Sequence, residues 1–263
     1  MDYFVWSVNP VLFSLGSINI RWYGVLFSFG FVFGYYTMRW IYIREHKNIN
    51  ELDKLLWYLI AGTLIGARLV HVLFYEPGYY FSNPLKTLAL WEGGLASHGG
   101  AIGIMFSIYL YQRNSNESYL WLLDRLSIPI AFTAFSIRLG NFFNSEILGI
   151  PGSVPWLIIF KKYDLIPRHP AQLYEALSYL LIFIVLLYFY KKHNLQRKQG
   201  VIFGSLLFFV FLSRFLIEFV KLKQESYDMA LMLNTGQLLS IPFMIIGLVL
   251  LNFSFKKETN AKL

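Results

Sequence analysis

The hydrophobic positions of this chain fall into seven long runs separated by shorter polar segments. We place the runs at residues 20–38, 55–75, 95–111, 126–143, 172–190, 201–220 and 237–255. Each run has the length of about 17 to 25 residues that an α-helix needs to cross the hydrocarbon core of a bilayer. The second, third and fourth runs carry polar residues at one end. The pattern predicts an all-α polytopic membrane protein of seven transmembrane helices, built as a single domain over residues 1–263.

The composition agrees with this interpretation and excludes several kinds of chemistry. Hydrophobic residues make up 56% of the chain and charged residues only 14%, whereas a soluble domain carries about a quarter charged residues. The chain has no cysteine, which excludes disulfides, thiolate metal sites and a cysteine nucleophile. Any thiol in its chemistry must come from a substrate. The first 17 residues contain no lysine or arginine and so lack the basic start of a cleavable signal peptide.

The net charge of +8 is distributed unequally between the two sets of alternate loops. Of the 23 lysines and arginines, thirteen lie in one set, six in the other and four within or at the edge of runs. The excess of positive charge marks the cytoplasmic side. We therefore expect an N-terminus outside, on the periplasmic side, and a cytoplasmic tail over residues 256–263. The basic excess is then an orientation signal that requires no nucleic acid.

The outer side of the membrane is predicted to carry the long, elaborated connections. Its long connections are residues 77–94 and 145–168, and loops of this length often carry function. The chain has no internal repeat and no inverted halves with matching broken helices, which disfavours a transporter. Small residues four apart at Gly62/Gly66 and Gly99/Gly103 are typical of closely packed membrane helices.

The sequence RLGNFFNSEILG at residues 138–149 places a guanidinium, two amides and a carboxylate at the end of an apolar stretch. A charge in hydrocarbon costs several kcal/mol, so such residues usually have a function. In a continuous helix, one broad face would carry Arg138, Asn141, Glu146 and Gly149. Asn144 would lie at the rim of this face. The glycines indicate instead that the helix gives way to a loop with a polar lining. Either geometry gathers the donors that an anionic headgroup needs. The alternative is an arginine that snorkels or pairs with Glu146.

A second arginine, Arg214, lies inside the sixth run with Glu218 four residues later on the same helix face. The two could form an internal ion pair, which is a frequent way to bury a charge. Close to Arg138, however, Arg214 would complete a two-arginine clamp suited to a phosphodiester. The sequence leaves both possibilities open.

Three further residues are candidates at the outer side of the membrane. His98 lies among four glycines in GGLASHGG, residues 93–100, and histidine is the usual general base near neutral pH. The alternative for His98 is a hydrogen bond at a helix start. Tyr23 and Arg68 place a phenol and a cation at or within runs, where interfacial anchoring is the ordinary role.

These strings together resemble the bacterial prolipoprotein diacylglyceryl transferases over nearly the whole chain. The strongest match is RLGNFFNSEILG, against a family signature of Arg, Asn, Asn, Glu and Gly at fixed spacing. Six others follow in the family's order: RWYG (21–24), GARLVHVLFY (66–75), GGLASHGG (93–100), HPAQLYEA (169–176), SRFLIEF (213–219) and GQLLSIP (236–242). The chain departs from the family at Ile137, where glycine is usual, and at Lys221, where arginine is commoner.

The resemblance implies seven spans with an outer N-terminus, a location in the bacterial cytoplasmic (inner) membrane, and no cofactor. It also implies transfer of the diacylglyceryl group of phosphatidylglycerol to the thiol of the lipobox cysteine in a preprolipoprotein. This reaction forms a thioether and releases glycerol 1-phosphate.

The resemblance further implies roles for named residues. Arg138 and Arg214 would bind the headgroup and stabilise its developing charge, and His98 would take the thiol proton or hold a water that does. Asn141 and Tyr23 would orient glycerol or phosphate oxygens. Glu146 would fix Arg138 or a neighbour, and Gly149 would permit a tight turn.

Two other classes remain as alternatives. One is a membrane transporter or channel with an arginine-lined anion site. The other is a structural membrane protein whose buried charges only pair with one another.

Overall fold

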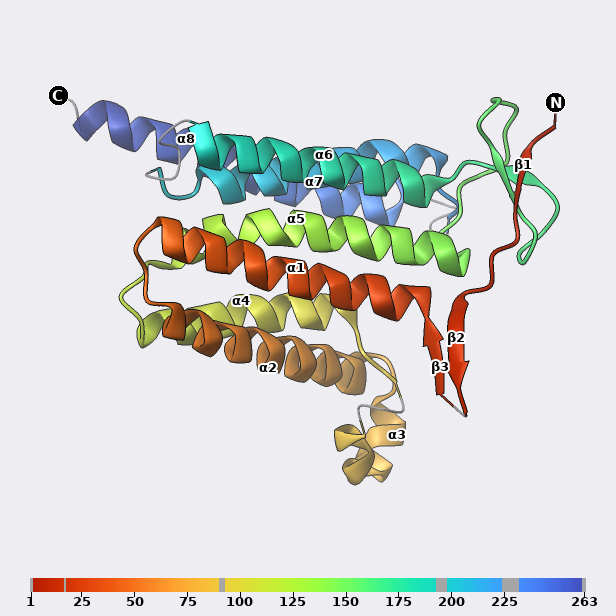
Figure 1. Cartoon of the computed structure of the whole chain (residues 1–263), viewed down its shortest axis with the longest axis horizontal. Helices are drawn as coiled ribbons and strands as arrows, with labels where there is room; N and C mark the ends of the chain where they lie inside the picture. The colour runs from red at the N-terminus through yellow and green to blue at the C-terminus, as the bar shows by residue number, and fades with distance from the viewer. Residues whose placement is uncertain (1, 17, 90–92, 193–197, 224–231, 262–263) are drawn as a thin grey trace. The chain divides into compact units, whose positions relative to one another are not determined.

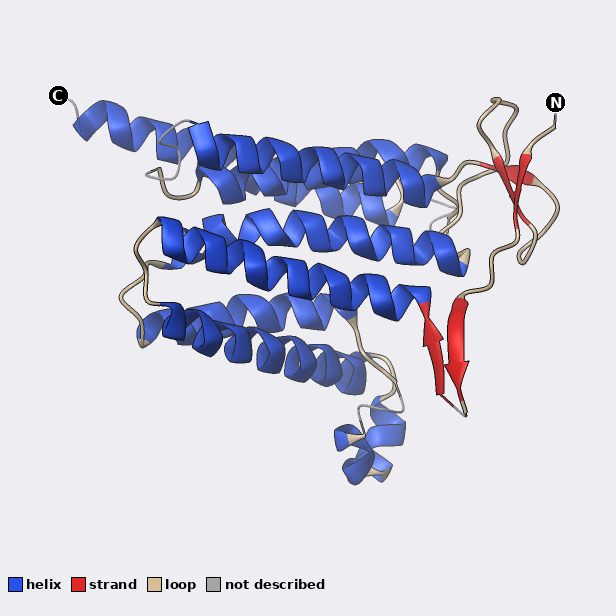
Figure 2. Cartoon of the chain, viewed as in Figure 1, coloured by secondary structure: helices blue, strands red, loops and turns tan. Residues whose placement is uncertain are grey.

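A computed structural model of the chain describes residues 2–16, 18–89, 93–192, 198–223 and 232–261. The chain forms two compact units, one of Met1–Thr37 with Leu123–Leu263 and one of Met38–Leu122. Each unit is described by itself below. Helices dominate both units (Figure 2).

Each of the seven predicted apolar runs forms most of one helix (Figure 1). These helices are α1 (Trp22–Arg44), α2 (Ile49–Phe74), α4 (Ser97–Arg113), α5 (Tyr119–Asn144), α6 (Ala171–Lys192), α7 (Val201–Ile217) and α8 (Thr235–Ala261). A short 3₁₀ turn, η4 (Glu218–Val220), extends α7. Among the described residues, five helices are long and apolar enough to cross a membrane: α2, α5, α6, α7 with η4, and α8. The chain is therefore a multi-pass helical membrane protein.

The structure adds five short strands that the hydrophobic pattern did not predict. They are β1 (Phe4–Trp6), β2 (Val11–Leu15), β3 (Ile18–Arg21), β4 (Ile158–Phe160) and β5 (Pro167–Arg168). β1 pairs in parallel with β4, which pairs antiparallel with β5, while β2 and β3 form a separate antiparallel hairpin. Because β3 includes Ile20 and Arg21, the first helix begins at Trp22, two residues later than the apolar run.

The three-stranded sheet is fixed to the end of α5 by a small apolar cluster. Phe142, Leu148, Ile158 and Phe160 are its buried members, with Trp6 and Leu173 packed against them. The ring centroids of Trp6 and Phe142 lie 4.3 Å apart. This cluster holds the chain that follows α5 against both the sheet and the start of α6.

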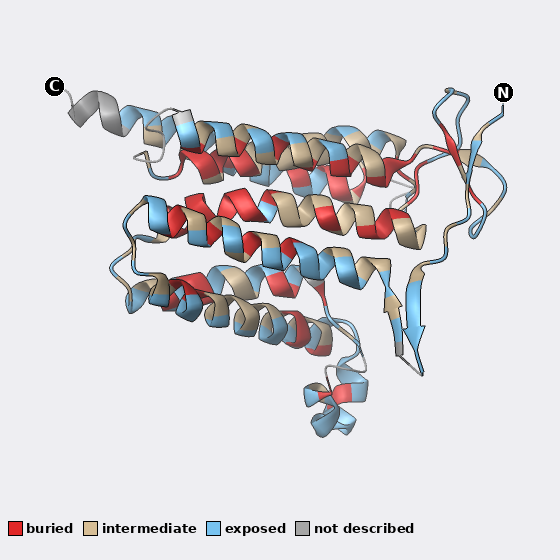
Figure 3. Cartoon of the chain, viewed as in Figure 1, coloured by how far each residue is buried: buried red, intermediate tan, exposed pale blue. Residues whose placement is uncertain are grey.

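Helix α5 is the most buried helix of the first unit (Figure 3). In its most apolar window 61% of the residues are buried, against 11% in α8. α1 packs on it where Thr133 donates a hydrogen bond to the carbonyl of Gly30 at 3.2 Å. Polar groups near the end of α5 are consequently shielded by protein and need partners there.

The second unit is built on the pair α2 and α4. At Gly62, Gly66, Gly99 and Gly103, an added Cβ would collide with backbone atoms of the facing helix or lie within 3 Å of them. The close packing predicted from their spacing is confirmed. A short helix, α3 (Pro77–Ser82), and a 3₁₀ turn, η1 (Pro84–Leu88), follow α2.

Candidate functional site: a buried charge network at the end of α5

The helix α5 ends in a turn that contains two left-handed residues. Ser145 and Ile147 have φ values of 57° and 56°, a region that is costly for a β-branched residue. They flank Glu146, whose backbone N–H donates to the carbonyl of Asn141 at 3.0 Å. Strain of this kind persists only where the surroundings over-determine the conformation. The turn therefore fixes the direction in which Glu146 leaves the helix.

Gly149 is needed for close backbone packing and not for the turn itself, since its φ is not positive. A Cβ there would collide with the carbonyl oxygen of His169 and lie 2.7 Å from that of Val220. The Gly149 N–H donates to His169 O at 3.0 Å, and Ile150 N–H donates to Val220 O at 2.9 Å. The close packing of Gly149 joins three segments, and its predicted role in a tight turn stays a prediction.

Arg138 forms an ion pair with Glu175 of α6, which is fully buried. The Arg138 Nε lies 2.9 Å from Glu175 Oε2, and the Lys221 Nζ lies 3.3 Å from Glu175 Oε1. Lys221 also lies 3.2 Å from the Oε2 of Glu218. One carboxylate therefore connects the arginine of α5 to the segment that follows α7.

A set of amides surrounds the same arginine. Arg138 Nη1 donates to Asn141 Oδ1 at 3.3 Å, and Asn141 Nδ2 donates to Glu146 Oε2 at 3.2 Å. Asn144 Nδ2 donates to the other carboxylate oxygen of Glu146 at 3.1 Å. Glu146 is thus held by Asn141 and Asn144, and the ion pair to Arg138 comes from Glu175. These hydrogen bonds support the interpretation that Glu146 holds a neighbour of Arg138.

Arg214 differs from Arg138 because its Nε is buried and has no hydrogen-bond partner among the described residues. Among the described residues Glu218 forms an ion pair with Lys221, and no ion pair joins it to Arg214. Tyr179 of α6 lies close enough to interact electrostatically with both Arg138 and Arg214. The two arginines therefore belong to one polar region of the first unit.

The charges of this region do not balance. Arg138, Lys221 and Arg214 are three cations, while Glu175 and Glu218 are two carboxylates. Glu146, at the edge, is exposed. Within the part of the chain that the structure describes, and leaving out the exposed Glu146, this region therefore has one more cation than carboxylates, and the Nε of Arg214 has no hydrogen-bond partner. These are the properties of a site that receives an anion with oxygen acceptors.

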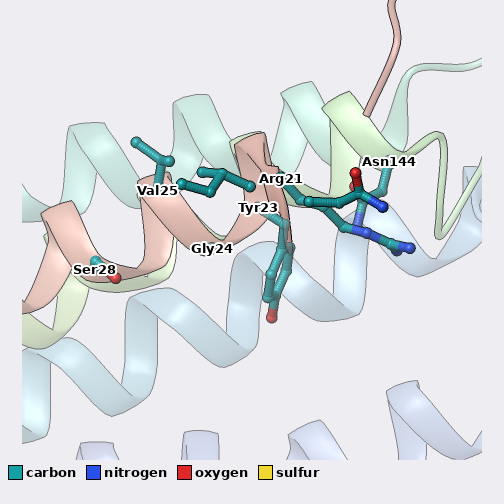
Figure 4. Close-up of a pocket in the computed structure, with 8 residues that line it drawn as sticks. Arg21, Tyr23, Gly24, Val25, Ser28 and Asn144 are labelled. Atoms are coloured by element: carbon teal, nitrogen blue, oxygen red, sulfur yellow. The ribbon is translucent and has the colours of Figure 1, made fainter. Parts of the chain in front are cut away.

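Tyr23 joins this region from the start of α1. A Cβ on Gly140 would lie 2.7 Å from a ring carbon of Tyr23, so Gly140 allows the ring to pack on α5. Tyr23 also interacts with the charges of Glu146 and Arg138. A cavity of about 650 Å³ adjoins it (Figure 4). The lining residues of this cavity are Asn19, Ile20, Arg21, Tyr23, Gly24, Val25, Ser28 and Asn144.

The structure thus brings six of the predicted site residues into one unit, and His98 belongs to the other. His98 is the second residue of α4 and is exposed. In its unit, the nearby loop is organised by Arg68, which donates to the carbonyls of Gly93 and Gly94 at 2.6 and 3.0 Å. The role of His98 remains a prediction.

Sequence reasoning missed Glu175 and Lys221 as members of the site. Glu175 is the only charged residue in the run 172–190. The argument that identified Arg138, the cost of a charge in an apolar run, would have found it. Lys221 gave no comparable signal, because it follows the end of the sixth run. Among the described residues, no group of three or more His, Asp and Glu side chains could hold a metal ion.

The fold and the site together define a class: a multi-pass helical membrane protein with a buried, arginine-containing polar site at one end of its central helix. Comparison with known sequences is more specific. The family profile described as prolipoprotein diacylglyceryl transferase matches residues 10–253.

Among curated proteins, the phosphatidylglycerol–prolipoprotein diacylglyceryl transferase of Tolumonas auensis is 47% identical over 254 residues, covering 96% of this chain and 98% of the relative. That of Chloroherpeton thalassium is 48% identical over 257 residues, covering 97% and 96%. That of Porphyromonas gingivalis is 43% identical over 277 residues, covering 99% and 98%. The chain belongs to the prolipoprotein diacylglyceryl transferase family.

Proposed function

We propose that this protein transfers the diacylglyceryl group of phosphatidylglycerol to the thiol of the lipobox cysteine of preprolipoproteins. The names of its relatives give the same lipid donor and the same class of acceptor. The observation that carries the proposal is the polar region in which the described residues supply three cations and two interior carboxylates and leave the Arg214 Nε without a hydrogen-bond partner. A phosphodiester carries one negative charge and non-bridging oxygens, which complement this region.

The reaction forms one bond and breaks one bond. The sulfur of the acceptor cysteine attacks the glyceryl carbon that bears the phosphate, and a C–S bond replaces the C–O bond. The bonding electrons leave with the phosphate oxygen, so glycerol 1-phosphate departs as a phosphomonoester. The thiol proton must be removed, because the thiolate is the nucleophile and an unperturbed thiol has a pKa of about 8.5.

The site residues divide between binding the headgroup and promoting this step. Arg138 and Arg214 hold the phosphate and stabilise the charge that it gains as the C–O bond breaks, a contribution of several kcal/mol where water is scarce. His98 takes the thiol proton or holds a water that does.

The other predicted residues orient these groups. Tyr23 and Asn141 direct the glycerol or phosphate oxygens, and Glu146 holds Asn141 in place. Gly149 keeps the segment after α5 against the start of α6.

The membrane arrangement that we propose has all seven long helices as spans in the bacterial cytoplasmic membrane. The N-terminus and the loop 145–168 lie outside, and residues 256–263 form a cytoplasmic tail, within one transferase domain. The excess of positive charge in one set of loops supports this orientation. Both substrates then reach the site from the outer half of the bilayer, and no cofactor is needed.

Two other functions are less well supported. A transporter or channel would place polar residues along the thickness of the membrane, whereas the network described here gathers at one end of α5. A structural protein whose charges only pair with one another would leave no buried donor unpartnered, in contrast to Arg214.

The test is a reconstituted assay with vesicles of phosphatidylglycerol and a peptide that carries a lipobox cysteine. Wild-type protein should yield a thioether-linked diacylglyceryl peptide and one glycerol 1-phosphate for each product. A matched peptide with serine in place of the cysteine should give neither. Absence of the thioether product from folded wild-type protein would overturn the proposal.

A further inference from the structure

The cavity shown in Figure 4 shares Tyr23 with the proposed headgroup site, and the other residues that line it have no role there. Three consecutive residues of its lining, Asn19, Ile20 and Arg21, come from the end of β3. The helix α1 supplies four others and α5 supplies Asn144. Among the described residues, none of β2 lines the cavity. The cavity is therefore formed by β3 together with α1 and α5.

β3 belongs to a sheet of two strands, and among the described residues no strand pairs with its edge opposite β2. Alternate backbone N–H and C=O groups of an edge strand point away from the sheet and are available to another chain. An extended peptide can add itself to such an edge, with main-chain hydrogen bonds for affinity and neighbouring pockets for side chains.

Asn144 provides a second, independent sign of a ligand. Its Oδ1 is buried and has no hydrogen-bond partner among the described residues. Its Nδ2 donates to Glu146 at 3.1 Å, which fixes the orientation of the amide. The free oxygen is an acceptor that a peptide N–H would satisfy. Asn144 thus links the cavity to the network around Arg138.

We propose that this cavity binds the acceptor polypeptide, as an extended segment paired along the free edge of β3 with its cysteine next to Asn144. The inference rests on the proposed function, which requires a peptide thiol to reach the headgroup site. A lipid could fill the cavity, but only a polypeptide can pair in series with a strand edge. The uncharged polar residues Asn19, Ser28 and Asn144 suit the main chain of such a segment.

Gly24 allows a direct test by filling the cavity. An added Cβ at this position meets no atom within 4 Å, and because Gly24 lines the cavity we expect the side chain of Gly24→Leu to reduce its volume. It should raise the KM for the lipobox peptide at least about tenfold. The KM for phosphatidylglycerol and the kcat at saturating peptide should not change. Gly78, in α3, is equally open, and Gly78→Leu is the matched control that should leave both constants unchanged.

The outcomes separate this inference from the proposed function. If wild-type protein makes no thioether, the proposed function fails before the cavity is tested. If wild-type protein is active and Gly24→Leu leaves the peptide KM unchanged, the inference is wrong. A rise in the KM for phosphatidylglycerol alone would assign the cavity to lipid and would also overturn it. Equal melting temperatures of the two variants and wild type establish that the chain still folds.

Cross-linking tests the strand pairing itself. Because the chain has no cysteine, each of Asn19→Cys, Ile20→Cys and Arg21→Cys introduces a unique thiol. The probe is a lipobox peptide with serine at the acceptor position and one cysteine moved along its length. Strand addition predicts disulfides that alternate with a period of two residues, and none with Leu12→Cys on β2. Equal cross-linking at all positions, or none, would contradict the pairing.

Discussion

Two arginines, one in each compact unit, differ in how many of their buried donors have a hydrogen-bond acceptor. Arg68 is 4% exposed and donates to five backbone carbonyls, those of Lys86, Thr87, Ala89, Gly93 and Gly94. Its guanidinium also lies 4.8 Å from the centre of the Tyr80 ring. Arg214 has a buried Nε without a partner among the described residues. The first has all the acceptors it can use, and the second lacks one.

A buried donor that has an acceptor and one that has none affect the stability of the fold in opposite ways. A buried donor without an acceptor costs about 1–3 kcal/mol, so a chain gains stability by losing it. A donor with satisfied acceptors has the opposite effect, because its removal strands every carbonyl that it served. The two arginines should therefore respond to substitution in opposite ways.

The largest effect should follow from Arg214→Leu. We expect transferase activity to fall about 10²–10³-fold, the usual loss when one preorganised charge donor is removed. The melting temperature in detergent should stay equal or rise, because the variant removes an unpartnered buried donor. The measurement pairs the reconstituted assay with thermal unfolding.

The adjacent residue Ser213 offers a control for this variant, since its hydroxyl is satisfied by the carbonyl of Val210 at 2.9 Å. Ser213→Ala should retain activity within a few-fold. An Arg214→Leu protein that unfolds at much lower temperature would mean that Arg214 is a structural residue like Arg68.

Arg68→Ala should show the reverse pattern. Five carbonyls lose their donor, and we expect the free energy of unfolding of the second unit to fall by about 3 kcal/mol or more. Residues 77–94, which Arg68 gathers, should become sensitive to protease at temperatures where wild type resists. Arg68→Lys should restore little of the lost stability, because an ammonium group cannot reproduce the planar set of donors of a guanidinium. Full protease resistance in Arg68→Ala would mean that Arg68 does not stabilise this segment, and the proposed difference between Arg68 and Arg214 would be wrong.

Glu175→Gln concerns Arg138, which has an ion-pair partner but lies in the same polar region as Arg214. The amide keeps the shape of the carboxylate but leaves Arg138 and Lys221 without their shared counter-charge. Activity should fall about tenfold, with a moderate loss of stability. The double variant Glu175→Gln with Lys221→Met should recover stability but not activity. If the single variant keeps full activity, Glu175 does not position Arg138.

The smallest effect concerns Arg168, a third arginine, whose partner Asp164 lies at the protein surface. Its hydrogen bonds to Asp164 lower the pKa of that carboxyl below its usual value of about 3.9. A lowered pKa stabilises the fold at every pH above the unfolded value and ceases to do so as the pH falls through the folded one. Hydrogen exchange in the loop 145–168 should therefore be constant from pH 5 to 8, after correction for intrinsic rates, and increase only below about pH 4. Asp164→Asn should abolish that increase, and a transition near pH 6 would contradict the assignment.

The sequence was sufficient to predict the helices and most residues of the polar network at the end of α5, because both depend on local patterns. Long apolar runs identify the spans, and one arginine inside such a run draws attention to residues 138–149. The pairing of Arg138 with Glu175 was not predictable, since it joins different helices and Glu146 was an equally plausible partner. The strand pair β1–β4 joins residues 4–6 to residues 158–160. Strands of three residues have no periodicity that a sequence pattern can detect.

The ion pair between Arg138 and Glu175 also has a consequence for how the protein enters the membrane. α5 and α6 follow each other in the chain, and each would bring an uncompensated charge into hydrocarbon if it were inserted by itself. Arg138 lies six residues before the end of α5, which is about 9 Å along the helix axis. Its charge therefore lies within the span and needs a counter-charge. Insertion of the two helices together, with the charges already paired, avoids that cost. The ion pair that orients Arg138 would thus make α5 and α6 a single unit of membrane integration.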